Sequence, residues 1–428
     1  MRKILVAGAG HGGLSAAYEL SKAGYDVTVV EAKQREELGY DWDDCLWMPS
    51  FKNAGIVLDD ERYVHPYFNI SYVNPNKSTK IVIPGEPRKT LLMCDRKYLL
   101  SVLIDRCEKV GTKFIFGCKI NKVIADISGV KGISTEQGDM FGDMVIDAAG
   151  IDSPVRSTLP SRAGIIRDIP QCDTFYTFRA YYENTDGFSM DPAQAIYFYH
   201  CYRPGMDWVI ADEGFIDILV GSFSPLTQEL IDEAVNDFRA EYPSMGKLIR
   251  GGTVQKIPLS KTISKFVWNG YAGIGDCCSM IDPLSGSGIT RCIDAGIILA
   301  KTVIGAKNQP LSQEVLWDYQ RTYMRYNSGV LSDNILRVML SSLNGKQMDY
   351  FFEKKVLTAK ELGSKSAAGY GAKEILDKVT ALVPQVKLIP AFASAGKKLL
   401  NISKVQKLMP SRFDSSDFDK WQKEYNKL

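Results

Sequence analysis

Six residues near the start of the chain have the types and spacing of a phosphate-binding turn. They read Gly8-Ala9-Gly10-His11-Gly12-Gly13 and contain the pattern GxGxxG. Gly8 permits a tight turn, Gly10 leaves room for a pyrophosphate, and Gly13 lets a helix pack closely on a strand. The first turn of that helix offers N–H groups and a positive dipole end to phosphate oxygens. This pattern predicts that the chain binds a dinucleotide.

A carboxylate follows at the distance where a ribose would need it. Glu31 lies 21 positions after Gly10, directly after an apolar segment. A carboxylate at this point accepts hydrogen bonds from ribose hydroxyls and disfavours a 2′-phosphate. We therefore expect FAD or NAD, rather than NADP, as the ligand. We expect His11, inside the turn, to pack or to touch the phosphate edge rather than to act as a catalyst.

These residues need a strand–helix–strand unit to position them, and the sequence provides one. Residues 3–7 form an apolar run typical of a buried parallel strand, and residues 14–22 are helical in pattern. Residues 25–30 form a second strand, and residues 142–150 contain another apolar strand that runs into a turn. The sequence therefore predicts an α/β fold with a Rossmann-type domain.

A second glycine cluster and a lone arginine carry a resemblance to a known group of proteins. Gly275-Asp276 is followed by the run from Pro283 to Ile289, PLSGSGI, and Asp95-Arg96 begins a helix between the two clusters. Together these motifs resemble the glutathione-reductase-like flavoproteins, and the resemblance selects FAD as the cofactor. It implies that Asp276 binds a ribityl hydroxyl and that Arg96 contacts the cofactor. The predicted FAD-binding residues are Gly8, Gly10, Gly12, Gly13, Glu31, Arg96, Ile120, Asp276, Pro283, Gly286, Gly288 and Ile289.

Within that group the chain is similar to the geranylgeranyl reductases, including the archaeal digeranylgeranylglycerophospholipid reductases. The segment from Asp95 to Gly111, the PLSGSGI turn and the helix after it carry this resemblance. The family's Tyr-x-Trp-x-Phe-Pro motif is altered, because Trp208 is present while the Phe-Pro pair after it is not. The resemblance implies an FAD-dependent oxidoreductase of isoprenoid lipid biosynthesis. Such an enzyme reduces isolated C=C bonds of a geranylgeranyl-type prenyl lipid by hydride transfer from FADH2.

The same resemblance suggests which side chains face the substrate. It places Cys45 beside the flavin and the substrate channel, and Cys45 or the hydroxyl of Tyr202 is the candidate proton donor. The aromatic segment around residues 195–208 is expected to cover an apolar pocket over the flavin. The candidates for that lining are Tyr197, Tyr199 and Trp208.

Two other functions remain open at this point. One is a flavin-dependent monooxygenase of an aromatic or lipid substrate, although Ala149-Gly150 stands where the aromatic hydroxylases carry Asp-Gly. The other is a flavoprotein with another electron-transfer role. The halogenase motif Trp-x-Trp-x-Ile-Pro is absent from the sequence, so halogenation is not expected.

The motifs also predict the domain organisation. We expect a discontinuous FAD-binding domain, an inserted antiparallel β substrate domain and a C-terminal helical tail. The FAD-binding domain is assigned to residues 1–60, 90–165 and 265–310, the substrate domain to 61–89 and 166–264, and the helical region to 311–428.

Composition excludes several other classes of protein. The chain has 428 residues and a formal net charge of +2, which does not favour a nucleic-acid binder. Its nine cysteines include no CxxC pair and its three histidines are scattered, so we expect neither a disulfide framework nor a metal site. No apolar run is long enough to span a bilayer, and a strand begins at residue 3. We therefore expect a cytoplasmic protein without a signal peptide.

One segment of the tail has an uneven charge. Residues 378–413 contain seven cations and no acidic residue, with apolar residues between them. Such a segment suits an anionic membrane surface, which would make the protein peripheral to the membrane. The same cations suit docking of an acidic electron carrier such as a ferredoxin-like protein, and NAD(P)H is the other candidate electron donor. The seven cations are Lys378, Lys387, Lys397, Lys398, Lys404, Lys407 and Arg412.

Overall fold

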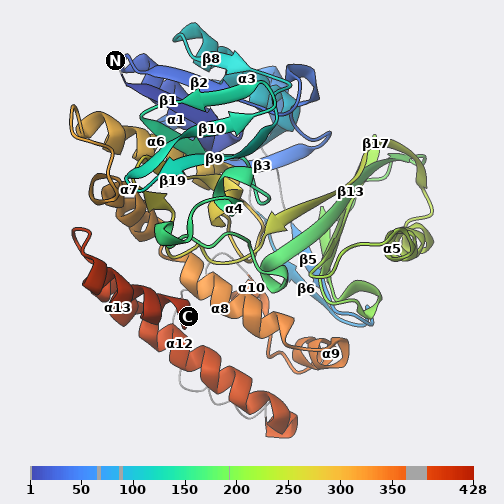
Figure 1. Ribbon diagram of the computed structural model, residues 1–428. Coiled ribbons are helices and arrows are strands. Elements are labelled where there is room, and N and C mark those ends of the chain that lie inside the picture. Colours follow the sequence, from blue (N-terminus) through green and yellow to red (C-terminus); the bar gives the residue numbers. More distant parts are fainter. Residues whose placement is uncertain (1, 65–68, 86–89, 192, 363–382) are drawn as a thin grey trace.

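The computed structural model describes residues 2–64, 69–85, 90–191, 193–362 and 383–428. Its first half is organised by a six-stranded sheet with the order β18-β19-β12-β1-β2-β8 (Figure 1). Neighbouring strands from β19 to β8 are parallel, and β18 is antiparallel to β19. The strands are β1 (Lys3–Ala7), β2 (Asp26–Val30), β8 (Lys113–Ile115), β12 (Met144–Asp147), β18 (Val267–Trp268) and β19 (Tyr271–Gly273).

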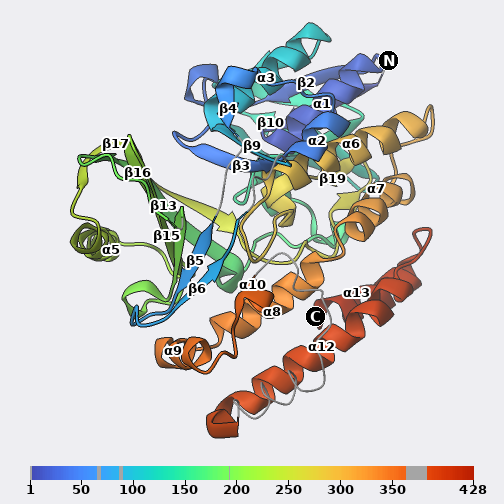
Figure 2. The ribbon, with the colours of Figure 1, turned by 180° about the vertical axis from the view of Figure 1, so that it is seen from behind.

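Both faces of this sheet are covered, which explains why β1 and β12 are apolar except for Lys3 at the start of β1 and Asp147 at the end of β12. In Figure 1 a smaller antiparallel sheet lies in front of the parallel sheet, and in Figure 2, seen from behind, helices α1 and α6 lie in front. The smaller sheet has the order β11-β10-β9. These elements are β9 (Ile120–Asp126), β10 (Gly129–Thr135), β11 (Gly138–Phe141), α1 (His11–Lys22), α3 (Arg96–Lys109) and α6 (Ile289–Gly305).

Helices α1 and α6 approach each other through glycines. A Cβ atom on Gly296 of α6 would lie 2.5 Å from the carbonyl oxygen of Gly12, and one on Gly12 would lie 2.9 Å from the carbonyl oxygen of Cys292. Real Cβ atoms do not come this close to backbone oxygen, so a side chain at either position would force the helices apart. This contact joins the first glycine cluster to the helix that follows the second cluster.

The substrate-side sheet has seven strands in the order β17-β13-β16-β15-β14-β5-β6. Its neighbouring strands are antiparallel except for β14 and β5, which are parallel. Helix α5 (Gln228–Glu241) covers one face through Ile231, Val235 and Phe238. The strands are β5 (Ile70–Val73), β6 (Lys80–Ile83), β13 (Thr174–Asn184), β14 (Gln194–Phe198), β15 (Met206–Asp212), β16 (Phe215–Ser222) and β17 (Met245–Pro258).

A third, small sheet has three strands that all lie between residues 43 and 95. It has the order β3-β7-β4, formed by β3 (Asp43–Trp47), β7 (Leu91–Asp95) and β4 (Tyr63–Val64). The predicted boundary at residue 61 assigned β4 to the substrate domain, whereas β4 pairs with β7 and only β5 and β6 join the seven-stranded sheet. The domain boundaries therefore remain a prediction, and we use the observed sheets below. Short helices α2 (Met48–Asn53) and α4 (Pro154–Ser157) complete the first half of the chain.

The last part of the chain is helical, as expected, and Figure 1 shows it running below the parallel sheet. Around Trp317, the side chains of Val405, Phe418 and Trp421 form an apolar cluster that attaches the last two helices to α7. None of the helices in the described ranges is long and apolar enough to cross a membrane. The helices are α7 (Gln313–Tyr326), α8 (Val330–Ser341), α9 (Gly345–Glu353), α10 (Ala359–Leu362), α12 (Ile389–Leu408) and α13 (Ser415–Asn426).

Candidate FAD and substrate site

The first glycine turn is pressed against the end of a neighbouring strand. Gly8 follows β1 with a φ of +90°, and a Cβ atom there would lie 2.7 Å from the carbonyl oxygen of Ala148. A Cβ atom on Gly10, the residue before α1, would lie 3.0 Å from the same oxygen. A Cβ atom on Gly13 would lie 2.6 Å from the Cβ of Ala148, so this glycine packs the helix on the sheet. The turn therefore keeps its backbone N–H groups at the sheet edge where a pyrophosphate is expected.

The predicted ribose-binding carboxylate borders this turn. One oxygen of Glu31 accepts a hydrogen bond from the N–H of Ala9 at 2.8 Å, and the other accepts one from the N–H of Lys33 at 2.9 Å. The carbonyl oxygen of Glu31 accepts from the N–H of Cys118 at 2.9 Å, which brings the start of β9, and with it the buried Ile120, to the same edge. The positions predicted for the adenosine half of FAD are thus neighbours in space.

Gly12 has a different environment from the other glycines of the turn. Its Cβ would clash with Ile274 and Cys292, both of which lie on the α6 side. The sequence prediction grouped Gly12 with the cofactor-binding residues, whereas the structure shows it serving the contact between α1 and α6. The extra glycine of the motif is explained by helix packing.

His11 holds a buried polar atom without a partner. Its Nε2 atom is buried and makes no hydrogen bond in the described part of the chain. Burial, and the nearby guanidinium of Arg96, lower the pKa of His11 to about 3, so the imidazole is neutral at physiological pH. A buried ring nitrogen left unpaired is costly in free energy, which favours a polar ligand group at this place.

Arg96 connects the two glycine clusters. It is the first residue of α3, and its guanidinium forms an ion pair with Asp44 and lies 4.9 Å from the ring centroid of Tyr40. The positive charge of Arg96 lowers the pKa of His11 in the first cluster. In the second cluster, burial raises the pKa of Asp276, and the charge of Arg96 lowers that pKa in part. The charge of Arg96 therefore acts on ionisable groups of both glycine clusters, and its contact with the cofactor stays a prediction.

The second cluster is organised by an aspartate at its base. Asp282 accepts hydrogen bonds from the N–H groups of Leu284 and Ser285 at 2.9 and 3.0 Å, and it forms an ion pair with Arg291. Gly286 has a φ of +73°, which completes the turn into α6 at Ile289. The conformation of this loop is therefore fixed by its own side chains.

A cavity of about 490 Å³ opens beside Asp276. Asp276 begins the turn after β19 and lies half-buried, and burial raises the pKa of its carboxyl group. The cavity extends from Tyr40, in the loop before β3, and Ala149, just after β12, to Tyr176 and Lys256 of the seven-stranded sheet. The volume suits part of a cofactor. The residues at both glycine clusters, the unpaired ring nitrogen of His11 and this cavity together fit FAD.

A second, apolar cavity lies against the other side of the Pro283–Leu284 turn. Its volume is about 70 Å³, and most of its lining is aromatic or aliphatic. Arg337, which forms an ion pair with Asp173, is its one charged lining residue among the described residues. The lining consists of Phe175, Phe198, Tyr199, Gly205, Met206, Phe223, Leu259, Pro283, Leu284, Arg337, Leu340, Ser341 and Met348.

The structure separates the two tyrosines that were expected to line the substrate pocket together. Tyr199 lines the apolar cavity, and its hydroxyl donates a hydrogen bond to the carbonyl oxygen of Leu343 at 2.6 Å. The hydroxyl of Tyr197 instead donates to Glu241 on α5 at 2.6 Å, so Tyr197 lies on the opposite face of the sheet. The reason is that Tyr199 follows the end of β14 with a φ of 50°, and the alternation of side chains ends there.

Trp208 also lies away from both cavities, where it contacts a buried ion pair. The guanidinium of Arg179 is 4.9 Å from the Trp208 ring centroid and forms an ion pair with the buried Asp217 at 2.6 Å. The same guanidinium donates a hydrogen bond to the carbonyl oxygen of Asp43 on β3 at 2.6 Å. Arg179 and Trp208 therefore attach the seven-stranded sheet to the small sheet that carries Cys45 and Asp44.

The two candidate proton donors are not brought together. Tyr202 is 53% exposed, and its hydroxyl donates a hydrogen bond to Asp349 on α9 at 3.3 Å. Cys45 is exposed on β3, one residue from the Asp44 that holds Arg96. Neither side chain lines the two cavities described above. The placement of Tyr202 differs from the expectation because a left-handed turn at residues 201–202 directs it to α9.

Several cavity residues escaped the sequence analysis. The cavity is lined by Met206 at the start of β15, by Phe223 just after β16 and by Leu259 just after β17. It is also lined by Arg337 and Ser341, which belong to α8 in the helical tail. Nothing in their local sequence marks them, since each is an ordinary apolar or helical residue. Phe198 lies inside the aromatic segment that the sequence analysis singled out, next to Tyr199, which was named there as a lining candidate.

Comparisons with known proteins agree with this geometry. Residues 1–169 match the family model of the FAD binding domain, which confirms FAD as the cofactor. The chain is 22% identical over 396 residues to a digeranylgeranylglycerophospholipid reductase of Sulfolobus acidocaldarius, with 89% of this chain and 86% of the relative covered. A geranylgeranyl bacteriochlorophyll reductase-like protein of Thermoplasma acidophilum superposes with a TM-score of 0.72 at 18% identity, covering 94% of this chain and 99% of that one.

A flavoprotein of another kind is more distant. A probable FAD-dependent monooxygenase from Pseudomonas aeruginosa superposes with a TM-score of 0.59 at 16% identity, covering 82% of this chain and 99% of that one. At these identities the two solved structures establish the fold. The expected α/β architecture, with an FAD-binding domain, an inserted sheet and C-terminal helices, is confirmed.

Proposed function

We propose that this chain, which carries an FAD binding domain and is similar to digeranylgeranylglycerophospholipid reductases, reduces isolated C=C bonds of a prenyl lipid. The observation that supports this best is the apolar cavity against Pro283 and Leu284. The same turn leads into α6, so the cavity lies beside the predicted flavin position. A small polar substrate would find few hydrogen-bonding partners in such a lining.

In this proposal the residues of the two glycine clusters hold the cofactor. Gly8 and Gly10 leave room for the pyrophosphate, Glu31 accepts hydrogen bonds from the adenosine ribose, and Ile120 lies near the adenine. Arg96 and Asp276 bind the middle of the molecule. The turn from Pro283 to Ile289 contacts the flavin ring, where N–H groups at the start of α6 stabilise negative charge on the reduced ring. When bound, reduced FAD supplies a hydride for the substrate double bond.

The cavity selects and positions the reacting bond. The apolar cavity has a volume of about 70 Å³. Since a water-sized group needs ~10–15 Å³, the cavity has room for about five carbon-sized groups, roughly one isoprene unit. A longer chain would extend out of the cavity along α8. Phe198, Phe223 and Leu284 exclude water from this unit, and a fixed alkene reacts faster than a mobile one. A proton delivered by the enzyme would then complete the reduction at the second carbon of the double bond.

Tyr199 positions this wall rather than supplying the proton. Burial raises the pKa of its hydroxyl to about 12, so it stays protonated. Its hydrogen is used in the bond to the carbonyl oxygen of Leu343, which connects the end of β14 to the loop after α8. Of the two candidate proton donors, Cys45 remains the proposed one, because its neighbour Asp44 on β3 forms an ion pair with Arg96. The hydroxyl of Tyr202 instead donates a hydrogen bond to Asp349.

We also propose a peripheral contact with an anionic membrane through α12. This helix carries Lys397, Lys398, Lys404 and Lys407 and no acidic residue, and Leu400 on it is 85% exposed. Lys378, the first cation of the predicted basic segment, lies outside the described residues. The electron donor is proposed to be either NAD(P)H or a ferredoxin-like protein, and anaerobic bleaching of the flavin absorbance by each would decide between them.

The reaction itself can be tested directly. The flavin-loaded protein, reduced chemically without oxygen, is mixed with a geranylgeranyl lipid, and the product is analysed by mass spectrometry. We expect a gain of two hydrogens for each bond reduced, with one flavin oxidised per bond. Incorporation of oxygen-18 from air with NADPH consumption would instead indicate a monooxygenase. Flavin turnover with an electron acceptor and no change in the lipid would indicate an electron-transfer role.

A further inference from the structure

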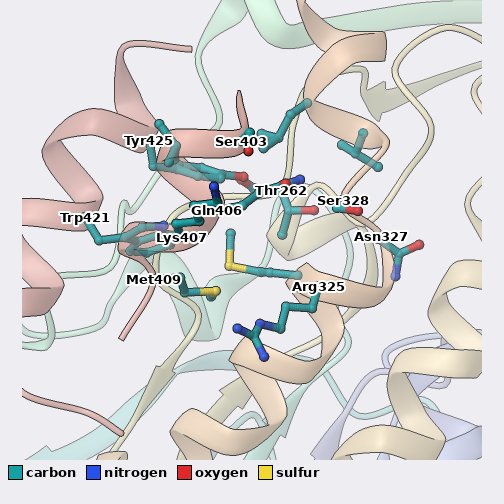
Figure 3. Close-up of a pocket in the computed structure, with 14 residues that line it drawn as sticks. Thr262, Arg325, Asn327, Ser328, Ser403, Gln406, Lys407, Met409, Trp421 and Tyr425 are labelled. Atoms are coloured by element: carbon teal, nitrogen blue, oxygen red, sulfur yellow. The ribbon is translucent and has the colours of Figure 1, made fainter. Parts of the chain in front are cut away.

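A separate cavity lies between the C-terminal helices and the body of the protein. It has a volume of about 300 Å³ and opens between α7 and α8 on one side and α12 and α13 on the other. Figure 3 shows its lining side chains, with Trp421 and Tyr425 on one side and Asn327 and Ser328 on the other. We refer to it below as the hairpin pocket. None of its lining residues belongs to the FAD-side cavity or the apolar cavity.

The inner wall of the hairpin pocket is apolar and adaptable. Met324 and Met409 both line it, and Figure 3 shows Met409 and Trp421 among its lining side chains. Val405 and Trp421 are both 2% exposed, so this wall is shielded from water except through the pocket. Thioether and aromatic side chains fit flexible alkyl chains well, because the Met side chain adjusts its shape. The wall therefore suits a single alkyl or prenyl chain.

The mouth of the pocket is cationic. Arg325, at the end of α7, and Lys407, at the end of α12, line it and are exposed. Neither forms an ion pair with any residue that the structure describes, and α12 contains no acidic side chain that would neutralise Lys407. Ser403 and Gln406 add hydrogen-bonding groups beside these charges. An arginine and a lysine that line the same pocket favour a phosphate-like anion there.

We propose that the hairpin pocket binds one chain of an anionic amphiphile. The alkyl or prenyl chain lies against Met324, Met409 and Trp421, and the phosphate-like head contacts Arg325 and Lys407. The volume is at the lower end of ligand-binding cavities, which fits one chain and excludes a folded partner. The site differs from the place of reduction and from the broad charge of α12, since Lys404 on that helix does not line the pocket.

Binding of dodecyl phosphate below its micelle concentration, measured by calorimetry on the flavin-loaded protein, tests this site. We expect saturable binding of one molecule per chain. The double variant R325Q/K407Q should bind about tenfold more weakly, since it removes charge-assisted hydrogen bonds. The matched variant K404Q removes a lysine of the same helix outside the pocket and should bind like the parent protein.

Three results would overturn the proposal. Equal affinity for inorganic phosphate would show a site for a free anion without a chain. Equal weakening by K404Q and by R325Q/K407Q would show attraction by surface charge alone, and unchanged binding in the double variant would show that the mouth does not take part. None of these results bears on the reductase proposal, because reduction of an uncharged prenyl alcohol is measured separately and does not need the pocket mouth.

Discussion

The FAD-binding edge and the apolar cavity differ in what holds them together. At the FAD-binding edge, Gly8 and Gly10 meet the carbonyl oxygen of Ala148, so backbone contacts between adjacent strands set the geometry. At the apolar cavity, side chains such as Phe198 and Ser341 come from elements more than a hundred residues apart. Backbone geometry tolerates almost no change, whereas a side-chain lining can be varied without loss of the fold. Backbone contacts therefore fix the geometry of the first region, and the second is where substrate preference can vary.

The largest expected effect concerns the ion pair that attaches the second region to the first. Replacing Arg179 by Met leaves Asp217 buried without its partner, and we expect a loss of about 3–5 kcal/mol in the free energy of unfolding. Burial already raises the pKa of Asp217 despite Arg179, so the carboxyl group would lose its main source of stabilisation. Chemical denaturation of the flavin-loaded protein measures this change. The double variant R179M/D217L is the control and should recover most of the stability, and equal stability of R179M and the parent would contradict the argument.

The next prediction tests whether backbone contact defines the FAD-binding edge. G8A introduces a Cβ atom 2.7 Å from the carbonyl oxygen of Ala148 at a φ of +90°. We expect FAD to bind about 10- to 100-fold more weakly, since the turn must shift at a cost of order 1–3 kcal/mol. G24A is the matched control, because Gly24 has a φ of +88° with no atom within 4 Å of the new Cβ. Similar FAD affinities for G8A and G24A would contradict the argument that the contact with Ala148 defines the FAD-binding edge.

A filled cavity should affect the substrate and leave the cofactor in place. Ser341 lines the apolar cavity, and S341F inserts a ring into it. We expect kcat/KM for the prenyl substrate to fall about tenfold, in line with the usual cost of overpacking, while FAD affinity stays within about twofold. The neighbouring Ser342 lies outside the lining, so S342F should behave like the parent protein. A parallel loss of FAD affinity in S341F would show that the two regions are not separable.

The two regions also contain histidines with opposite pKa shifts. At the FAD-binding edge, burial lowers the pKa of His11 to about 3, so the folded state loses stability as pH falls from 6.5 towards 3. In the substrate-side sheet, burial is outweighed by hydrogen bonding to Asp207, and the pKa of His200 rises to about 10. The stability that His200 contributes is complete below pH 6.5 and is lost as pH rises towards 10. Denaturation across pH should lose the first slope in H11Q and the second in H200Q, and unchanged slopes would refute these assignments.

The smallest expected effect concerns a residue that sequence alone favoured. Tyr202 is exposed and bonded to Asp349, away from both cavities. We expect Y202F to change the rate of reduction by less than about twofold, as surface substitutions usually do. A pH–rate profile that lost one limb in Y202F would instead restore Tyr202 as the proton donor.

Some features of the site could be predicted because their residues are neighbours in sequence. The turn from Gly8 to Gly13 and Glu31 belong to one strand–helix–strand unit, and the turn from Pro283 to Ile289 is a single loop. Their spacing therefore predicted a dinucleotide, the resemblance to flavoproteins selected FAD, and the FAD binding domain match confirms FAD. The roles of Tyr197, Trp208 and Tyr202 could not be predicted in this way. Their orientations depend on where β14 ends and on the left-handed turn after it.

The amino-acid sequence by itself predicted the FAD fingerprints and the α/β architecture, because each depends on local spacing and on apolar patterns, and its motifs carried the resemblance to the geranylgeranyl reductases. Tertiary structure alone decided which side chains enclose the apolar cavity, that Gly12 serves helix packing, and that Arg325 and Lys407 meet at the mouth of one pocket. The physical reason is that such contacts join residues far apart along the chain. Their meeting depends on the packing of whole sheets and helices, which no short stretch of sequence encodes.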